Sequence, residues 1–289
     1  MKKGESVIFK RRGADKIRFA AVFVLFTLYA LALLFPYAFA FNAALKESGR
    51  AFMRDMVSIS KPAKWDNFIL VFKEFEVADN SYLMTLFNSL WYSIGGALIN
   101  LTVLTMSSYV ISKYKFKGRN FLYNLMIITL LLPIVGAGPA LYRLLYDLRI
   151  KETPFILLIF TGGLMSLIIY AYFAAIPWEY AESAFIDGAG HFVVFAKIML
   201  PQALPALSVI FIMNVVGNWN DYATPILYLN RSYPTIASGL YLFQEKIRYN
   251  AAHPIFFAGA LIAALPLVIL FALLQNILMN KVFLGGIKG

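Results

Sequence analysis

Six long stretches of this 289-residue chain contain no Asp, Glu, Lys or Arg. Each stretch exceeds the ~20 residues that a helix needs to cross the ~30 Å hydrocarbon core of a bilayer. The composition agrees, because 61% of the residues are hydrophobic and 14% are charged, whereas a soluble domain has roughly 45–50% apolar and about 25% charged residues. The sequence therefore predicts an all-α integral membrane protein. The six predicted transmembrane helices are residues 18–45, 82–112, 120–142, 154–177, 203–229 and 254–280.

The basic residues indicate how these spans are oriented. Seven of the 26 Lys and Arg residues lie within the first 18 positions, and four more lie in the short loop from Lys113 to Arg119. Basic residues close to helix ends favour the cytoplasmic side of a membrane, so we expect both termini in the cytoplasm. The net charge of +11 is explained by this anchoring, and we expect membrane lipid rather than nucleic acid beside it. The first apolar run is too long for a cleaved signal sequence, whose apolar region has ~7–15 residues.

These features divide the chain into four predicted parts. Residues 1–17 form a basic cytoplasmic N-terminus, and residues 18–81 form the first span with a folded external loop. Residues 82–280 form the transmembrane core, which includes a cytoplasmic loop at residues 178–202 between spans four and five. Residues 281–289 form a cytoplasmic tail.

The loop between spans four and five is predicted to contain two short helices. Glu179 and Glu182 suit the first turns of one helix, where the helix dipole favours acidic side chains. Asp187-Gly188 then ends it, because glycine adopts the left-handed conformation without a Cβ penalty. A second short helix is predicted over about residues 190–198, and Pro201 marks the entry to the fifth span.

Small residues on the first of these helices leave a low surface, at Ala181, Ser183 and Ala184. Another protein could approach such a surface closely. The residues alone fit two interpretations equally: a docking site for a partner, or an amphipathic loop at the membrane surface.

The segment from Glu182 to Ala189, followed by Ile198 and Leu200-Pro201, resembles the EAA loop of ABC importer permeases. That pattern reads E-A-A, three residues, G, and later I-x-L-P; this chain departs from it by Ser183 in place of the first Ala. The resemblance implies that the loop forms the coupling helices that sit in a groove of the ATPase subunit. The implied coupling residues are Glu179, Ala181, Glu182, Ser183, Ala184, Asp187, Gly188 and Ala189.

Other motifs are similar to those of carbohydrate-importer permeases. They are Asn88-Ser89, the basic loop 113–119, Trp219-Asn-Asp-Tyr222 and the ending 275–289. Of the two permeases that form such an importer, the chain resembles the shorter, MalG-like one. The resemblance implies a type I ABC importer permease in the cytoplasmic membrane of a bacterium or archaeon. It also implies a second homologous permease subunit in a heterodimer, an ABC ATPase dimer on the cytoplasmic side, an extracytoplasmic solute-binding protein and a carbohydrate substrate.

Motifs for catalysis and cofactor binding are missing from the sequence. There is no G-x-x-x-x-G-K-[ST] and no Gly-Lys dipeptide, so the chain has no phosphate-binding P-loop. There is no cysteine, no G-x-S-x-G, and the two histidines stand apart from other metal-binding residue types. We therefore expect no catalytic residue, no metal and no cofactor in this chain, with ATP and Mg²⁺ bound by the partner ATPase.

Two alternatives to a sugar-importer permease stay open. One is an ABC importer permease for a non-sugar solute. The other is an ion-coupled secondary transporter, which usually places an ionisable residue within the membrane. Asp221, near the predicted outer end of span five, is the nearest candidate for such a residue. An EAA-like loop is not required by a carrier of that kind.

Polar residues recur along one face of the fifth span: Asn214, Gly217, Asn218, Asp221 and Tyr222. Their spacing is that of a single helix face. Side-chain amides that face lipid would be costly, so this polar stripe should face the bundle or a water-filled path. It fits interhelical hydrogen bonding that holds the subunits together. It also fits a lining that offers Asn214, Asn218, Asp221 and Tyr222 to sugar hydroxyls.

Overall fold

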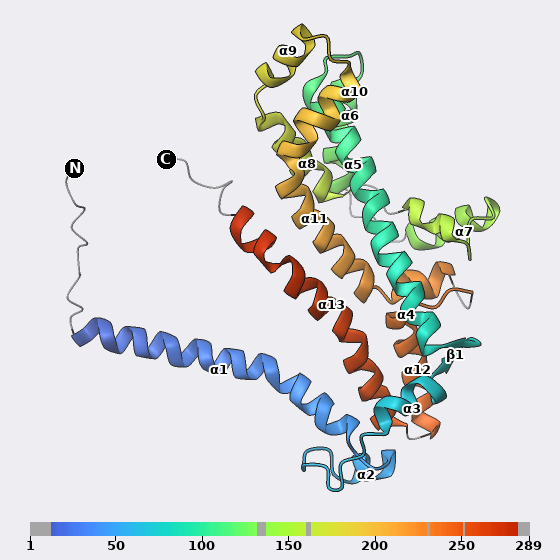
Figure 1. Ribbon diagram of the computed structural model, residues 1–289. Coiled ribbons are helices and arrows are strands. Elements are labelled where there is room, and N and C mark those ends of the chain that lie inside the picture. Colours follow the sequence, from blue (N-terminus) through green and yellow to red (C-terminus); the bar gives the residue numbers. More distant parts are fainter. Residues whose placement is uncertain (1–12, 132–136, 160–162, 230–231, 251, 283–289) are drawn as a thin grey trace.

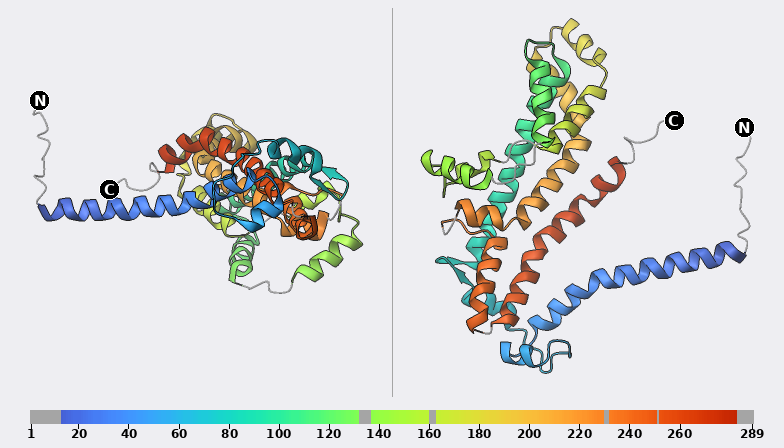
Figure 2. Two further views of the ribbon diagram at one scale, coloured as in Figure 1. Left: turned by 90° about the horizontal axis from the view of Figure 1, so that it is seen from below. Right: turned by 180° about the vertical axis from the view of Figure 1, so that it is seen from behind.

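The computed structural model describes the chain as an elongated helical bundle from which the first helix extends sideways (Figure 1). The two further views in Figure 2 show the same separation of the first helix from the bundle. The described residues are 13–131, 137–159, 163–229, 232–250 and 252–282.

Helix α1 (Gly13–Ala44) is apolar and exposed along nearly its whole length. It contacts the rest of the chain near its C-terminal end, where the Phe39 ring packs against Phe52 and Phe257. The helix begins at Gly13 rather than at residue 18, so the predicted boundary at residue 17 lies inside it. A helix this apolar and this exposed requires lipid or another chain around it.

The segment after α1 is folded, as the sequence predicts. It contains α2 (Gly49–Arg54), α3 (Asn67–Glu74) and a small hairpin of β1 (Glu76–Val77) and β2 (Asn80–Ser81). The hairpin pairs Glu76 with Ser81 and Val77 with Asn80.

Two long helices match their predicted spans. The second span is one continuous helix, Tyr82–Lys113, composed of α4 (Tyr82–Leu90), a π-helical turn η1 (Trp91–Gly95) and α5 (Gly96–Lys113). The last span is α13 (His253–Val282). The Tyr82 hydroxyl joins them by donating to the carbonyl of Gly259 at 2.6 Å. Tyr82, Val71, Phe75, Ile236 and Ala258 lie together in a buried core beside α13.

The third predicted span is wrong as a single helix over residues 120–142. Helix α6 (Arg119–Leu131) has 13 residues, and α7 (Ala137–Asp147) starts separately and extends away from the bundle (Figure 1). Pro139 falls in the first turn of α7, where its missing N–H costs no helical hydrogen bond. A proline there therefore begins a new helix instead of bending an old one.

The fourth predicted span is also divided. It consists of a 3₁₀ helix η2 (Pro154–Ile159) and α8 (Leu164–Ala175). Helix α8 is followed by α9 (Glu179–Ile186), and the two helices are bent by 63° at the break between them.

The fifth span differs from its prediction at both ends. A continuous helix of 30 residues, His191–Asn220, combines α10 (His191–Val194), a π-helical turn η3 (Phe195–Met199) and α11 (Leu200–Asn220). No separate short helix ends before Pro201, because the wider η3 turn precedes Pro201, which lacks an N–H to donate. The helix stops at Asn220, and η4 (Pro225–Leu229) and α12 (Ile236–Asn250) follow it.

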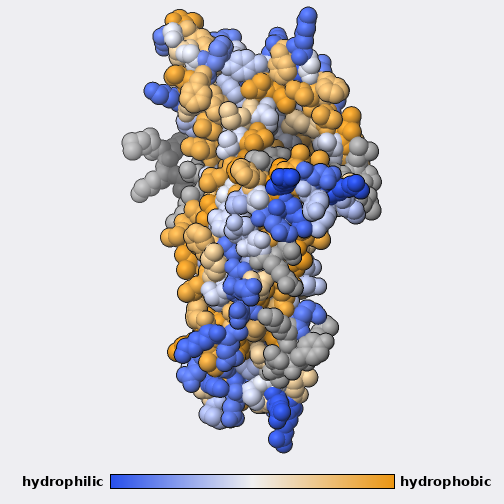
Figure 3. All heavy atoms as spheres, turned by 90° about the vertical axis from the view of Figure 1, so that its right-hand side faces the viewer, coloured by the Kyte–Doolittle hydropathy of each residue, from blue (hydrophilic) through white to orange (hydrophobic). Residues whose placement is uncertain are grey.

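Within the described residues, four helices are long and apolar enough to cross a membrane, or five if the bent α8–α9 pair counts as one span. Figure 3 shows apolar side chains along the flank of the bundle and hydrophilic ones at its two ends, with a further hydrophilic patch midway, where α7 lies. The four long helices are Lys16–Ala44, Tyr82–Lys113, His191–Asn220 and His253–Gln275.

Candidate coupling and translocation sites

A sharp helical corner, formed by α9 and α10 and here called the α9–α10 corner (residues 179–194), lies at one end of the bundle (Figure 1). Gly188 has φ +82° at the turn. The N–H of Gly188 donates to the carbonyl of Phe185 at 3.0 Å, and the N–H of Ala189 donates to that of Ala184 at 2.9 Å. These two bonds form a Schellman motif, which needs a residue in the left-handed region. The prediction that Asp187-Gly188 ends the helix is confirmed.

The corner divides the predicted coupling residues into an outer and an inner group. Ala181 is fully buried against the bundle, so it supports α9 from within and is not part of the exposed surface. Ala184 and Ala189 are half-buried. The exposed members are Glu179, Glu182, Ser183, Asp187 and Gly188.

Three exposed apolar side chains at the corner were missed by the sequence reasoning. Tyr180 is 53% exposed, Phe192 is 74% exposed and Ile186 is 86% exposed. Ile186 lies seven residues after Glu179, so it shares a helix face with Glu179 and Glu182. Testing the helical period across this loop would have found Ile186. An apolar tip beside acidic side chains is the composition of a protein-docking surface.

Aromatic contacts fix the corner to the bundle. The Tyr114 hydroxyl, just after α5, lies 3.0 Å from Nδ1 of His191. The Trp178 ring packs edge-on against Tyr114 at 5.8 Å, and Phe185 packs against His191 at 4.9 Å. These contacts join the corner to α5 and to the continuous helix that starts at His191.

The basic loop 113–119 also stabilises this end of the bundle. The Lys113 ammonium donates to the carbonyl of Ile176, at the C-terminus of α8. The Arg119 guanidinium donates to the carbonyls of Ile111 at 2.7 Å and Ser112 at 3.2 Å, at the C-terminus of α5. Cations at helix C-termini satisfy the last carbonyls and complement the helix dipole.

The polar stripe of α11 faces the Tyr82–Lys113 helix of the same chain. Nδ2 of Asn214 donates to Oδ1 of Asn100 at 3.4 Å, and Nδ2 of Asn218 donates to the carbonyl of Ser93 at 3.4 Å. Both asparagines are half-buried. The observed interhelical hydrogen bonds thus join two helices within one subunit, and one edge of each side chain stays accessible.

Asp221 and Tyr222 do not continue the helical face, because α11 ends at Asn220. Asp221 nevertheless stays beside the same helix, since the Tyr92 hydroxyl donates to its Oδ2 at 3.1 Å. Tyr222 is exposed and stacks on Tyr241 of α12, with ring centroids 4.9 Å apart and planes 17° apart. Tyr241 was missed, because sequence spacing cannot show which rings meet across helices.

Trp219 packs inside the chain, at the end of α11. It is 5% exposed, and its Nε1 donates to the carbonyl of Ala263 at 3.2 Å. The end of α11 is therefore held to α13 on one side and to the Tyr82–Lys113 helix on the other.

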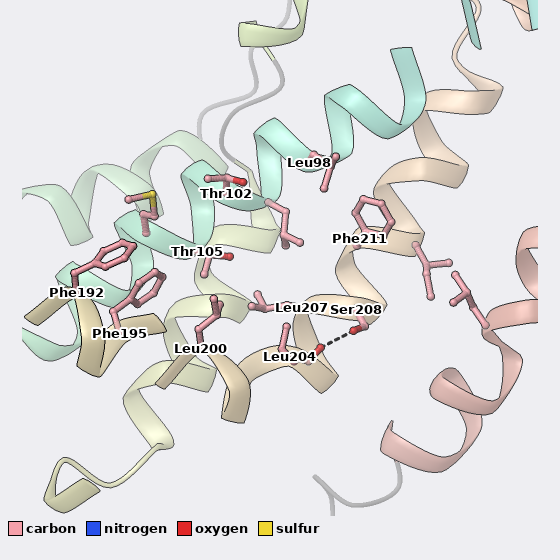
Figure 4. A pocket seen from close by; sticks show the side chains of 14 residues that line it. Leu98, Thr102, Thr105, Phe192, Phe195, Leu200, Leu204, Leu207, Ser208 and Phe211 are labelled. Carbon is pink, nitrogen blue, oxygen red and sulfur yellow. Dashed lines mark hydrogen bonds between the residues drawn. The ribbon is translucent and has the colours of Figure 1, made fainter. Parts of the chain in front are cut away.

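A cavity of about 440 Å³ lies between α5, the η3–α11 helix and α13. Figure 4 shows that leucine and phenylalanine side chains surround it. Its few polar groups include Ser208, whose hydroxyl donates to the carbonyl of Leu204 at 2.7 Å, and Thr105. The Thr105 hydroxyl is buried and has no hydrogen-bond partner among the described residues. So apolar a cavity offers little to sugar hydroxyls.

This arrangement defines a class: a helical membrane protein with an exposed corner at one end of its bundle. A comparison with protein families matches residues 102–283, more than half of the chain, to the family described as the binding-protein-dependent transport system inner membrane component. The chain therefore belongs to this family of ABC transporter permeases.

Relatives and solved structures agree with that assignment. The arabinooligosaccharide transport permease AraQ of Halalkalibacterium halodurans is 30% identical over 226 residues, covering 78% of this chain and 79% of its own. The maltodextrin transport permease MdxG of Bacillus subtilis is 29% identical over 277 residues, covering 92% and 95%. A crystal structure of a bacterial ABC transporter that imports the acidic polysaccharide alginate covers 92% of this chain and 98% of its own, with a TM-score of 0.76 at 21% identity.

Proposed function

We propose that this chain is a transmembrane permease subunit of an ATP-driven, binding-protein-dependent importer for an oligosaccharide or another carbohydrate. The family match supports the transporter class, and the arabinooligosaccharide and maltodextrin relatives support the substrate class. The structural observation that carries the proposal is the direct continuity between the α9–α10 corner and the 30-residue helix that holds the polar stripe.

The α9–α10 corner is the proposed contact with the ATPase dimer. Glu182 supplies a charge to the contact, and Ile186 and Phe192 supply exposed apolar surface. Gly188 keeps the turn tight enough to insert between walls of a groove. In this proposal ATP and Mg²⁺ bind to the ATPase subunits, and this chain receives their motion.

The polar stripe is the proposed wall of the translocation path, through Asn214, Asn218, Asp221 and Tyr222. Asn214, Asn218 and Asp221 are hydrogen-bonded to the Tyr82–Lys113 helix at 3.1 to 3.4 Å. The two asparagines are only half-buried, and the exposed Tyr222 ring stacks on Tyr241. Amides, a carboxylate and an aromatic face are the groups that sugar-binding sites use for hydroxyl and ring contacts.

The proposed assembly contains a second homologous permease, so that two chains enclose the path. The exposed apolar surface of α1 supports the need for further contacts with lipid or protein. The proposal includes six spans, and α6 and α8 each form part of one of them. The N- and C-termini lie in the cytoplasm, and the membrane is the cytoplasmic membrane of a bacterium or archaeon. An extracytoplasmic solute-binding protein delivers the sugar on the α2 side.

The test is reconstitution of this chain in proteoliposomes with its partner permease and ATPase. The liposomes have the ATPase on the inner side and the binding protein on the outer side. Uptake of labelled oligosaccharides should then require both ATP inside the liposomes and the binding protein outside them. Uptake by this chain alone under an ion gradient would instead establish a secondary transporter. Saturable ATP-driven uptake of a non-sugar solute, with no sugar transported, would agree with the importer mechanism but would overturn the proposed substrate class.

A further inference from the structure

A polar cavity of about 390 Å³ lies just beyond the C-terminal end of α1, and here it is called the loop cavity (residues 46–62). Four cations line it, Lys46, Arg50, Arg54 and Lys61, against the two carboxylates of Glu47 and Asp55. The lining thus has an excess of two positive charges.

Lys46 contributes a buried, positively charged side chain to the loop cavity. It is 5% exposed, and its ammonium donates to the Ser58 carbonyl at 2.7 Å and to the Ser58 hydroxyl at 3.2 Å. Among the described residues no carboxylate lies within ion-pairing distance of it. Burying an ammonium group is costly without an anion beside it.

Asp55 is one of the two carboxylates in the lining, but its Oδ1 accepts hydrogen bonds from the loop itself. Its Oδ1 accepts hydrogen bonds from the N–H of Val57 at 3.2 Å and of Ser58 at 3.0 Å. Hydrogen bonding from Ser58, together with the charge of Lys46, holds the pKa of Asp55 below its ordinary value. Asp55 therefore stays ionised and shapes the wall, and Arg50 and Arg54 remain exposed at the rim.

The loop cavity is fixed by hydrogen bonds from α1 and α3. Nδ2 of Asn42 donates to the carbonyl of Ser58 at 2.9 Å, and its Oδ1 accepts from the N–H of Ser60 at 3.0 Å. Nδ2 of Asn67 donates to the carbonyls of Ala44 at 2.7 Å and Lys46 at 2.8 Å. The cations are thus displayed on a pre-organised frame.

Its position along α1 places the cavity at the bilayer surface. Lys46 is the first charged residue after an uncharged run that begins beyond Arg18. Those 27 residues span roughly 40 Å as a helix, and a bilayer with its headgroups is about 40–45 Å thick. With α1 upright across the bilayer and Arg18 at one surface, Lys46 would lie in the headgroup layer of the other.

Exposed apolar side chains lie in the same segment of the chain as the cations, and Ile59 also lines the cavity. Val57 is 76% exposed, Ile59 is 77% exposed, and Trp65 is 60% exposed beside Phe41, with ring centroids 5.8 Å apart. Apolar and aromatic side chains of this kind enter the membrane interface. A soluble anion or a carboxylate of a hydrated protein surface would leave them in water.

We propose that the loop cavity binds the phosphate of an anionic phospholipid in the leaflet on the α2 side. Lys46, Arg50 and Arg54 contact the headgroup while Val57 and Ile59 rest among the upper acyl chains. This site would hold the C-terminal end of α1, where the helix packs on the rest of the chain, in a defined place in the membrane. The inference does not depend on the transported solute.

The test compares two double variants of the full-length chain, taken from liposomes of phosphatidylcholine and phosphatidylglycerol. Arg50→Gln with Arg54→Gln removes rim charge from exposed positions, which spares the fold. Lys64→Gln with Lys73→Gln removes equal charge from the same segment outside the cavity. Native mass spectrometry measures the retained ratio of phosphatidylglycerol to phosphatidylcholine.

The wild type and the Lys64/Lys73 variant should retain phosphatidylglycerol selectively, and the Arg50/Arg54 variant should lose about tenfold of that selectivity. Equal retention in all three proteins, or equal loss in both variants, would overturn the site. Displacement of the lipid by soluble glycerol 3-phosphate at low concentration would show a free phosphate ester site and overturn the lipid assignment. Unchanged lipid retention with lost uptake in the Arg50/Arg54 variant would assign the surface to a protein partner instead.

Discussion

Substituting Gly188 by valine tests whether the α9–α10 corner couples this chain to an ATPase. Gly188 has φ +82°, and a Cβ added there meets no other atom within 4 Å. The whole effect is therefore backbone strain, which costs about 1–2 kcal/mol for a residue with a Cβ in the left-handed region and more for a β-branched one. A strain energy of about 1–2 kcal/mol would make the docking-competent conformation of the turn about 5- to 30-fold less populated.

Gly190 supplies the matched control two residues away. It has φ −75° and ψ 161°, and it too has free space around an added Cβ. Gly190→Val thus introduces the same side chain into an unstrained extended backbone. Gly188→Asn is a second control, because asparagine tolerates the left-handed region.

The assay measures three quantities in the same membranes: the amount of inserted chain, the ATPase that copurifies with it, and ATP-driven uptake. Gly188→Val should insert at the wild-type level but lose about tenfold in copurified ATPase and in uptake, while Gly190→Val and Gly188→Asn stay near wild type. If Gly188→Val and Gly190→Val behave alike, the shape of the turn is not what couples the two proteins.

Three further predictions concern topology, charge at the corner and the path. Single cysteines at the exposed positions Ser58 and Ser183 should react with an impermeant thiol reagent from opposite sides of the membrane, and labelling from one side would refute the six-span layout. Glu182→Arg reverses an exposed charge and should reduce ATPase copurification and uptake with insertion unchanged; wild-type uptake would exclude Glu182 from the coupling contact. Asn218→Leu removes a half-buried amide that is bonded to the Ser93 carbonyl. A sugar hydroxyl that passes it would then be left unpaired, at about 1–3 kcal/mol, so sugar uptake should fall about tenfold or more while the partner permease still copurifies. Loss of the partner together with uptake would show that Asn218 holds the assembly together and does not line the path.

The sequence predicts well where local chemistry has one solution. Tyr82–Lys113 and His253–Val282 follow from charge-free runs that a soluble fold could not bury. The turn at Gly188 follows from the conformational preference of glycine. Charged residues at the boundaries of these runs, Asp79 and Lys113 for one and Arg248 and Lys281 for the other, leave little choice.

The sequence predicts poorly where one residue type permits two outcomes. Proline kinks a helix or begins one, and the sequence around Pro139 and Pro225 does not distinguish these outcomes. In the structure Pro139 lies in the first turn of the described part of α7, and Pro225 begins η4, so neither proline kinks the interior of a long helix. Pairings between helices are likewise invisible in one sequence. The partners of Asn214 and Asn218 emerge only when α11 packs beside the Tyr82–Lys113 helix.

The continuous helix His191–Asn220 gives the proposed coupling a mechanical basis. Its 30 residues extend about 45 Å, so a tilt of about 5° at the corner would displace the far end by about 4 Å. The stripe that this displacement would move is held by two asparagine bonds of 3.4 Å, and a single such bond contributes only about 0.5–1.5 kcal/mol. Bonds this weak can separate and re-form in each cycle, whereas the buried Trp219 bond to Ala263 and the apolar packing around it resist sliding. We therefore expect the end of α11 to move together with α13, to which Trp219 holds it, and to separate from the Tyr82–Lys113 helix at Asn214 and Asn218, which is the side where a sugar would pass.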